Sequence, residues 1–128
     1  FMLAWGGIAS LELSLSAMWT ESAVRGATLP DLARWMSAAP AKLAGLEARK
    51  GAIAVGRDAD LVAFDPETMW VVAARNLSQR HKVTPYAGRT LRGRVIATWL
   101  RGELVQREGE FAQERWGRCM LEMEPSSK

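Results

Sequence analysis

The first part of the chain repeats apolar residues at three- and four-residue steps. Between positions 8 and 24 the repeating residues are Ile8, Leu11, Leu15, Met18 and Trp19. This spacing puts them on one face of a helix, so we predict a helix over residues 8–24. Gly26 follows as a residue that can end it.

A second helix is expected directly afterwards. Thr28 precedes Pro30 and Asp31, and the combination of a capping hydroxyl, an early proline and an acidic residue is a helix start signal. The buried stripe predicted for this helix consists of Leu32, Trp35 and Met36.

Pro40 predicts a break in this second helix, because a proline inside a helix removes a hydrogen-bond donor. Residues 41–44 are then expected to form a further helical turn that Gly45 closes. The helical pattern ends near Lys50, which we take as the main boundary of the chain.

After Lys50 the pattern becomes strand-like. Ile53 and Val55 precede a turn at residues 56–58, and an apolar run follows over residues 60–64, which together predict a hairpin. Asp65 and Pro66 are expected to stop that run, and residues 69–72 to form a short strand of their own.

Residues 73–93 are predicted to be a long loop. A second hairpin is expected beyond it, with strands at 95–100 and 103–106 joined by Arg101 and Gly102. A two-residue link needs positive φ, which glycine adopts readily. From Gln113 the tail carries apolar residues that could dock as a short helix, namely Trp116, Cys119, Met120 and Met123.

The composition narrows the possible classes of protein. The chain has 128 residues, of which 48% are apolar and 24% charged, as is usual for a globular domain. A single cysteine excludes an intrachain disulfide and favours a reducing cytosol. We find neither a secretory leader nor a run of about 20 apolar residues that would predict a membrane span.

Charge is distributed unevenly, although the net charge is only +3. No acidic residue occurs between Glu67 and Glu103, an interval that holds Arg75, Arg80, Lys82, Arg89, Arg92, Arg94 and Arg101. Few aromatic residues are interleaved with these cations, so a solvated or subunit-facing surface is favoured over nucleic-acid binding.

The residue types present argue against a catalytic or metal site of the chain's own. His81 and Cys119 are the nitrogen and sulfur donors available, 38 positions apart, whereas catalytic zinc needs three protein ligands. Asp58 and Asp60 suit a structural role at a turn better than an acid–base pair. Three serines have no base nearby in the sequence, namely Ser10, Ser14 and Ser16.

The best candidate for direct function is the glycine-containing turn at residues 5–8. Gly6 and Gly7 lack Cβ atoms, so a ligand could approach the backbone N–H and C=O groups of this turn and of Ile8. The alternative is a helix-entry turn in which the glycines only allow close packing. Of the six tryptophans, we expect Trp19 and Trp35 on helical stripes, and Trp99 in a strand, to serve core packing.

Four motifs of the chain carry a recognisable pattern. KGAIAVGRDADLVAFDP, residues 50–66, resembles the segment after the barrel in the cyclic amidohydrolases, the family of dihydropyrimidinase, dihydroorotase and allantoinase. SAAPAKLAGL, residues 37–46, resembles the helix before that segment in the same family. AWGGIASLEL at 4–13 and RHKVTPYAGRTLRGRV at 80–95 narrow the resemblance to the allantoinases.

The resemblance implies an α/β fold in which residues 1–49 are the last helices of a (β/α)8 barrel. Residues 50–112 would then be strands of a small composite β-sandwich domain, and residues 113–128 a tail. A complete barrel needs about 250 residues, so we expect this chain to be the C-terminal portion of a longer enzyme.

The resemblance also implies a cytoplasmic, oligomeric hydrolase that opens the cyclic amide ring of allantoin to allantoate. Such enzymes use two divalent metals, commonly zinc, whose ligands precede the GGI segment, so we expect this chain alone to bind no metal and to be inactive. Gly6, Gly7 and Ile8 would contact substrate. The loop at Arg80, His81 and Lys82 would lie near the active-site mouth or at a subunit interface, unless His81 only hydrogen-bonds the loop backbone.

Two other functions stay open at this point. Within the enzymes, a hydantoinase or dihydropyrimidinase would carry similar motifs. Outside them, the chain could be a non-catalytic, truncated interaction module.

Overall fold

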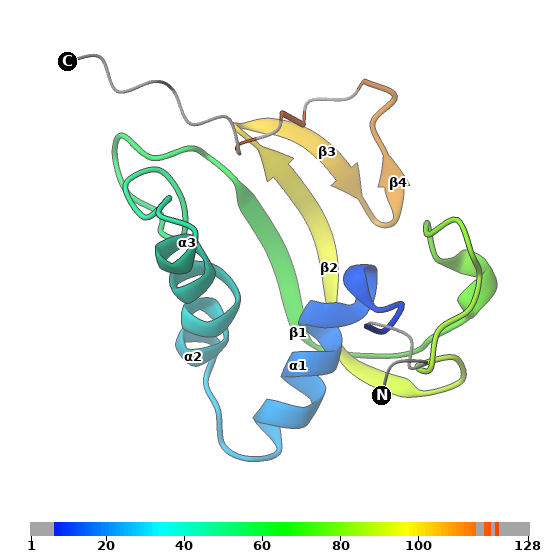
Figure 1. Cartoon of the computed structure of the whole chain (residues 1–128). Coiled ribbons are helices and arrows are strands. Elements are labelled where there is room, and N and C mark those ends of the chain that lie inside the picture. Colours follow the sequence, from blue (N-terminus) through cyan, green and yellow to red (C-terminus); the bar gives the residue numbers. More distant parts are fainter. Residues whose placement is uncertain (1–6, 115–116, 119, 121–128) are drawn as a thin grey trace, which may run out of the picture.

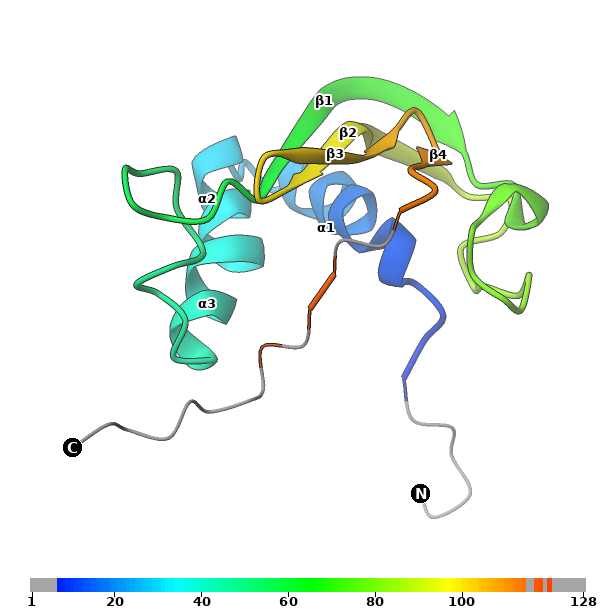
Figure 2. The same cartoon turned by 90° about the horizontal axis from the view of Figure 1, so that it is seen from above.

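The computed structural model describes residues 7–114, 117, 118 and 120. It consists of one antiparallel sheet and of helices that lie on one side of it (Figure 1). The strands are, in their order across the sheet, β1 (Leu61–Val71), β2 (Thr90–Leu100), β3 (Glu103–Arg107) and β4 (Glu110–Phe111). Seen from above, helix α1 (Ser14–Ala23) lies beneath the sheet, while α2 (Leu29–Ala33) and α3 (Ala39–Leu43) lie toward one end (Figure 2). No helix among the described residues is both long and apolar enough to span a membrane.

The first predicted helix is confirmed. A single 3-10 turn over Leu11–Leu13 leads into α1 at Ser14–Ala23, and Gly26 follows in the positive-φ conformation that ends many helices. The predicted apolar face is only partly correct: Trp19 is buried, but Ile8, Leu11 and Met18 are exposed. The buried Leu13 was not among the residues predicted for this face.

The start of the second helix, α2 at Leu29–Ala33, is also as predicted. The Thr28 hydroxyl accepts a hydrogen bond from the Asp31 N–H, and the Asp31 carboxylate accepts one from the Thr28 N–H at 3.0 Å. This capping box satisfies backbone donors that have no partner inside the helix. Leu32 is buried, but Trp35 is 40% exposed, so the predicted stripe is only partly covered.

The predicted break at Pro40 is wrong. The helix continues from α2 through a π-helical segment, Arg34–Ala38, into α3 at Ala39–Leu43. The Ala39 N–H donates to the Arg34 carbonyl, five residues back rather than four. A widened turn of this kind accommodates a proline, which has no N–H to donate, without ending the helix.

The first predicted hairpin is also wrong. Ile53 and Val55 form no strand and are exposed at 90% and 106%, so residues 50–60 are a loop. Strand β1, Leu61–Val71, instead runs through Asp65 and Pro66, with its register shifted between Asp65 and Met69. It continues because Asp65 accepts hydrogen bonds from Glu67 N–H and Thr68 Oγ1, and because an edge strand tolerates a proline.

The second predicted hairpin is confirmed. Strands β2, Thr90–Leu100, and β3, Glu103–Arg107, are joined by Arg101 and Gly102, which have φ of 51° and 88°. Apart from a 3-10 turn at Ala74–Asn76, the predicted loop is irregular up to residue 89, whereas its last four residues, 90–93, belong to β2. A short strand that the sequence pattern does not reveal, β4 at Glu110–Phe111, completes the sheet.

The core joins the helical half to the sheet. Leu13, Val72, Leu77 and Leu91 form a buried cluster against which Trp70 and Tyr86 pack. Leu13 ends the 3-10 turn, and Leu77 lies in the long loop, so burial of these two side chains draws the loop against the start of α1. Of the predicted tail helix, Trp116, Cys119 and Met123 lie outside the described residues.

Candidate functional site

The glycine turn is accessible in the part that the structure describes. Gly7 has φ of +90°, and a Cβ built there would meet no atom within 4 Å. Ile8 is 63% exposed. Gly6 lies outside the described residues. Among the described residues, the space beside Gly7 and around the Ile8 side chain is therefore open.

The basic loop residues Arg80, His81 and Lys82 are all exposed. The Lys82 ammonium donates a hydrogen bond to the Leu77 carbonyl, which closes the loop on itself.

These two segments, 72 or more positions apart in sequence, lie at the same end of the molecule (Figures 1 and 2). The Glu12 carboxylate connects them, because it accepts a hydrogen bond from the Ser78 N–H at 2.7 Å and a longer one from the Ser78 hydroxyl at 3.5 Å. This contact places the residues that follow the glycine turn next to those that precede the basic loop.

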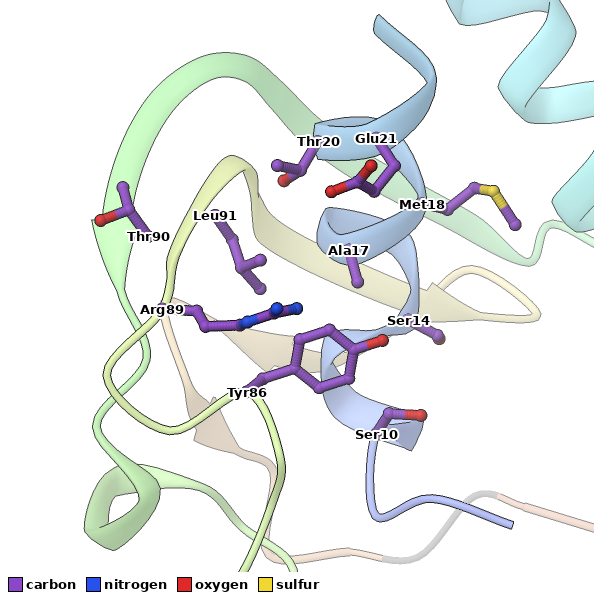
Figure 3. A pocket seen from close by; sticks show the side chains of 10 residues that line it. All are labelled: Ser10, Ser14, Ala17, Met18, Thr20, Glu21, Tyr86, Arg89, Thr90 and Leu91. Atoms are coloured by element: carbon purple, nitrogen blue, oxygen red, sulfur yellow. The ribbon is translucent and has the colours of Figure 1, made fainter. Parts of the chain in front are cut away.

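A groove of about 620 Å³ lies beside them, between α1 and the end of the long loop. Figure 3 shows Tyr86 and Arg89 pointing from the loop toward α1, where Ser14 and Glu21 line the opposite side. The Arg89 guanidinium lies 5.9 Å from the centre of the Tyr86 ring. Sequence reasoning missed this groove, because no local motif marks side chains that meet across 70 positions.

Asp58 and Asp60 belong to a cluster of charged residues away from this groove. The Lys50 ammonium contacts the Asp58 carboxylate at 2.7 Å and also pairs with Asp60, while Arg49 contacts Asp58 at 3.2 Å. Asp60 in addition accepts a hydrogen bond from the Arg101 N–H at 2.8 Å, which holds the β2–β3 turn. The predicted structural role of the two aspartates agrees with these contacts, but Lys50, their common partner, was missed.

The cluster affects the acid–base properties of its members. The hydrogen bond from Lys50 holds the pKa of Asp58 below its ordinary value of 3.8. Partial burial alone would lower the pKa of Lys50, but its hydrogen bonds to Asp58 and Asp60 outweigh this and raise the pKa above 10.5. Both groups are therefore charged at neutral pH.

We expect the stabilisation from this cluster to depend on pH. Because the folded-state pKa of Asp58 is lowered, its contribution is complete above 3.8 and disappears as the pH falls through the folded-state value. Because the pKa of Lys50 is raised, its contribution is complete below 10.5 and disappears as the pH rises through the folded-state value. The substitution Lys50→Met should lower the denaturation midpoint at pH 7, and this loss should shrink at pH 3.

The matched control for this prediction is Lys42→Met on α3, which removes an exposed ammonium and so changes the net charge of the chain by the same amount. It should change the midpoint little at either pH. A Lys50→Met deficit that is equally large at pH 3 and pH 7 would contradict the electrostatic account and indicate packing of the lysine stem instead.

The described residues do not form a metal centre. No three His, Cys, Asp or Glu side chains gather into a possible ligand set among them. Ser14 donates to the Leu11 carbonyl at 2.9 Å, and Ser16 is buried, with no basic side chain bonded to either in this part of the structure. The described residues therefore do not fit a bound metal, and we assign them no metal-dependent step.

Residues 6–105 match the amidohydrolase family. The chain belongs to this family. The family assignment made from the four motifs is thereby confirmed, and the family is one of TIM-barrel enzymes, although the described residues themselves form helices and a small antiparallel sheet.

This amidohydrolase chain is 51% identical over 125 residues to the allantoinase of Streptomyces avermitilis, a match that covers 98% of the chain and 27% of that protein. It is 41% identical over 123 residues to the allantoinase of Arabidopsis thaliana, covering 94% and 24%. The chain thus spans about a quarter of the length of these relatives.

Solved structures of hydantoinases share its fold. The L-hydantoinase (dihydropyrimidinase) from Arthrobacter aurescens is 36% identical with a TM-score of 0.80, over 87% of the chain and 25% of that protein. The D-hydantoinase from a Thermus species is 32% identical with a TM-score of 0.82, over 92% and 26%.

Proposed function

We propose that this chain is the C-terminal portion of an allantoinase-like hydrolase, which opens the cyclic amide ring of allantoin to give allantoate. The observation that carries the proposal is the 51% identity to an allantoinase over 98% of the chain. Identity to the hydantoinase structures is lower, at 36% and 32%, and so favours allantoin over hydantoins or dihydropyrimidines as substrate.

In this proposal, residues 1–49 contribute the terminal helices of the barrel and residues 50–112 a share of the β-domain, followed by a tail over 113–128. The packing of α1 against β2 supports a close association of the two parts. The Thr20 hydroxyl accepts a hydrogen bond from the Arg92 N–H at 2.8 Å, and Trp19 Nε1 donates to the Pro66 carbonyl at 2.9 Å. We further propose that the enzyme is a cytoplasmic oligomer, as the resemblance of this chain to the cyclic amidohydrolases implies.

The role of this chain in the reaction is to contact substrate rather than to perform the bond cleavage. Amidohydrolases are metal-dependent in general, and two divalent ions, commonly zinc, would activate the attacking water. The backbone at Gly6, Gly7 and Ile8 would offer donors and acceptors to the amide edges of a planar ring. Arg80, His81 and Lys82 would lie at the mouth of the site or at a subunit contact.

The proposal is tested with a chimera. We would replace the matching quarter of the Streptomyces avermitilis allantoinase with this chain and measure hydrolysis of allantoin, hydantoin and dihydrouracil. We expect kcat/KM for allantoin to exceed that for the other two by at least about tenfold, equivalent to about 1.4 kcal/mol of transition-state binding. The 128-residue chain alone is expected to show neither turnover nor stoichiometric zinc.

The control is a second chimera that carries the matching segment of the Arthrobacter aurescens L-hydantoinase. A folded chimera with this chain that hydrolyses hydantoin or dihydrouracil faster than allantoin would overturn the assignment in favour of the other cyclic amidases. A folded chimera without any hydrolysis would overturn the enzymatic role and favour an interaction module.

A further inference from the structure

Glu12 is the side chain that joins the long loop to the start of the helical half. Its two carboxylate oxygens face one residue, at 2.7 Å from the Ser78 nitrogen and 3.5 Å from the Ser78 hydroxyl oxygen. A backbone N–H that donates to a carboxylate forms a charge-assisted bond, which is stronger than one between neutral groups. The carboxylate thus restrains the position of the loop backbone at Ser78.

Both ends of this contact are anchored in the core. Leu13 follows Glu12 and is 1% exposed, and Leu77 precedes Ser78 and is also buried. These two leucines belong to one hydrophobic cluster. Glu12 and Ser78 are therefore held at the surface by buried neighbours, so the hydrogen bond forms between a side-chain carboxylate and a backbone N–H whose chain segments packing has already brought together.

The loop beyond Ser78 is braced internally. Lys82 donates to the Leu77 carbonyl, and Gln79 Nε2 donates to the Val83 carbonyl at 3.1 Å. These bonds make residues 77–83 a compact unit rather than an extended strand of chain. A restraint at Ser78 consequently sets the position of Arg80, which is at most about 7 Å further along the backbone.

We propose that Glu12 is a positioning residue, which sets the loop with Arg80, His81 and Lys82 against the glycine turn at Gly7 and Ile8 so that the two segments form one edge of the substrate site. The activity part of this inference rests on the proposed function. Glu12 itself touches no substrate in this proposal. It acts through the loop and therefore affects substrate binding more than the bond-breaking step.

The first test uses the 128-residue chain and does not depend on activity. Trypsin cleaves after Arg80 and Lys82, and cleavage requires the loop to open locally. We expect Glu12→Ala to increase the rate of cleavage at these two sites about tenfold, as expected when a charged hydrogen bond is lost. Glu12→Gln should stay within about threefold of the unmodified chain, because its amide can accept from the Ser78 N–H and donate to the Ser78 hydroxyl.

The matched control is Glu21→Ala, which removes a glutamate from the same helical region. Glu21 lies in α1 and pairs at 3.0 Å with Arg25, which follows the end of the helix, and both side chains are exposed. Within the described residues it has no bond to the loop. Its removal should leave cleavage at Arg80 and Lys82 unchanged. Equal cleavage rates in Glu12→Ala and the unmodified chain would overturn the proposal, as would an equal acceleration by Glu21→Ala.

The second test uses the allantoinase chimera described above. There Glu12→Ala should raise KM for allantoin about tenfold with less than a threefold change in kcat. Glu12→Gln should keep KM close to that of the unmodified chimera. If the unmodified chimera hydrolyses allantoin but Glu12→Ala leaves KM unchanged, the positioning role is wrong and the proposed function stands. If the unmodified chimera is inactive, the proposed function fails, and the trypsin result alone decides whether Glu12 positions the loop.

Discussion

Replacing Gly93 with alanine is expected to lower the free energy of unfolding by about 3 kcal/mol or more. Gly93 has φ of +89°, a conformation that costs an L-residue with a side chain about 1–2 kcal/mol. The added Cβ would also lie 2.2 Å from Phe64 Cζ and 2.8 Å from Trp19 Cδ1. Overpacking of this kind costs a further 1–3 kcal/mol or so.

The backbone at Gly93 cannot move aside cheaply to relieve this overlap. Its carbonyl accepts a hydrogen bond from Trp70 Nε1 at 2.9 Å, so a shift of the strand would strain a second contact. The measurement is the midpoint of urea denaturation of the alanine variant, monitored by tryptophan fluorescence.

Gly109→Ala is the matched control for this prediction. Gly109 has φ of +90°, nearly the same as Gly93, but a Cβ there would meet no atom within 4 Å. It should therefore lose only the conformational part, about 1–2 kcal/mol. Equal losses in the two variants would show that packing around Gly93 is looser than described.

The second large effect is expected from Trp19→Ala, which should cost about 3–5 kcal/mol of unfolding free energy. Trp19 is 6% exposed, and its ring meets Phe64 edge-on, with the ring centres 6.5 Å apart. The Arg92 guanidinium lies 5.9 Å from the centre of the Trp19 ring. Removal would leave a cavity between α1 and the sheet, measurable as a loss in the calorimetric melting temperature.

Two further variants separate the contributions of this side chain. Trp19→Phe keeps an aromatic ring but loses the hydrogen bond that Trp19 donates to the Pro66 carbonyl. That carbonyl still accepts a hydrogen bond from Arg92 Nε at 3.2 Å, so we expect losing the Trp19 bond to cost only about 1 kcal/mol. Trp35→Ala removes a 40% exposed tryptophan and should cost no more than about 1.5 kcal/mol. A Trp35→Ala loss as large as that of Trp19→Ala would contradict the distinction between the two.

Features that depend on neighbouring residues were predictable from the sequence. The capping box of Thr28 and Asp31, the end of α1 near Gly26, and the Arg101–Gly102 turn each involve groups within a few positions of one another. Their chemistry works in almost any surroundings. The four motifs likewise identified the family, because they are runs of consecutive residues.

The errors concern places where distant partners change a local preference. Ile53 and Val55 have the alternation of a strand, but in this structure the nearby Lys50 cluster and the packing of Gly51 against Ala41 hold their segment as a loop. At Pro40 the helix widens rather than ending, and β1 continues past Pro66 because it lies at the edge of the sheet.

The sequence by itself determined the family, the start of α2, one hairpin and the residues worth testing as a site. Only the tertiary structure decided that the glycine turn and the basic loop lie at one end, since Glu12 and Ser78 are 66 positions apart. It also decided that Lys50 unites Asp58 and Asp60, and that Trp19 rather than Trp35 is enclosed. The physical reason is that burial and charge pairing depend on distances in space, which periodicity along a chain does not specify.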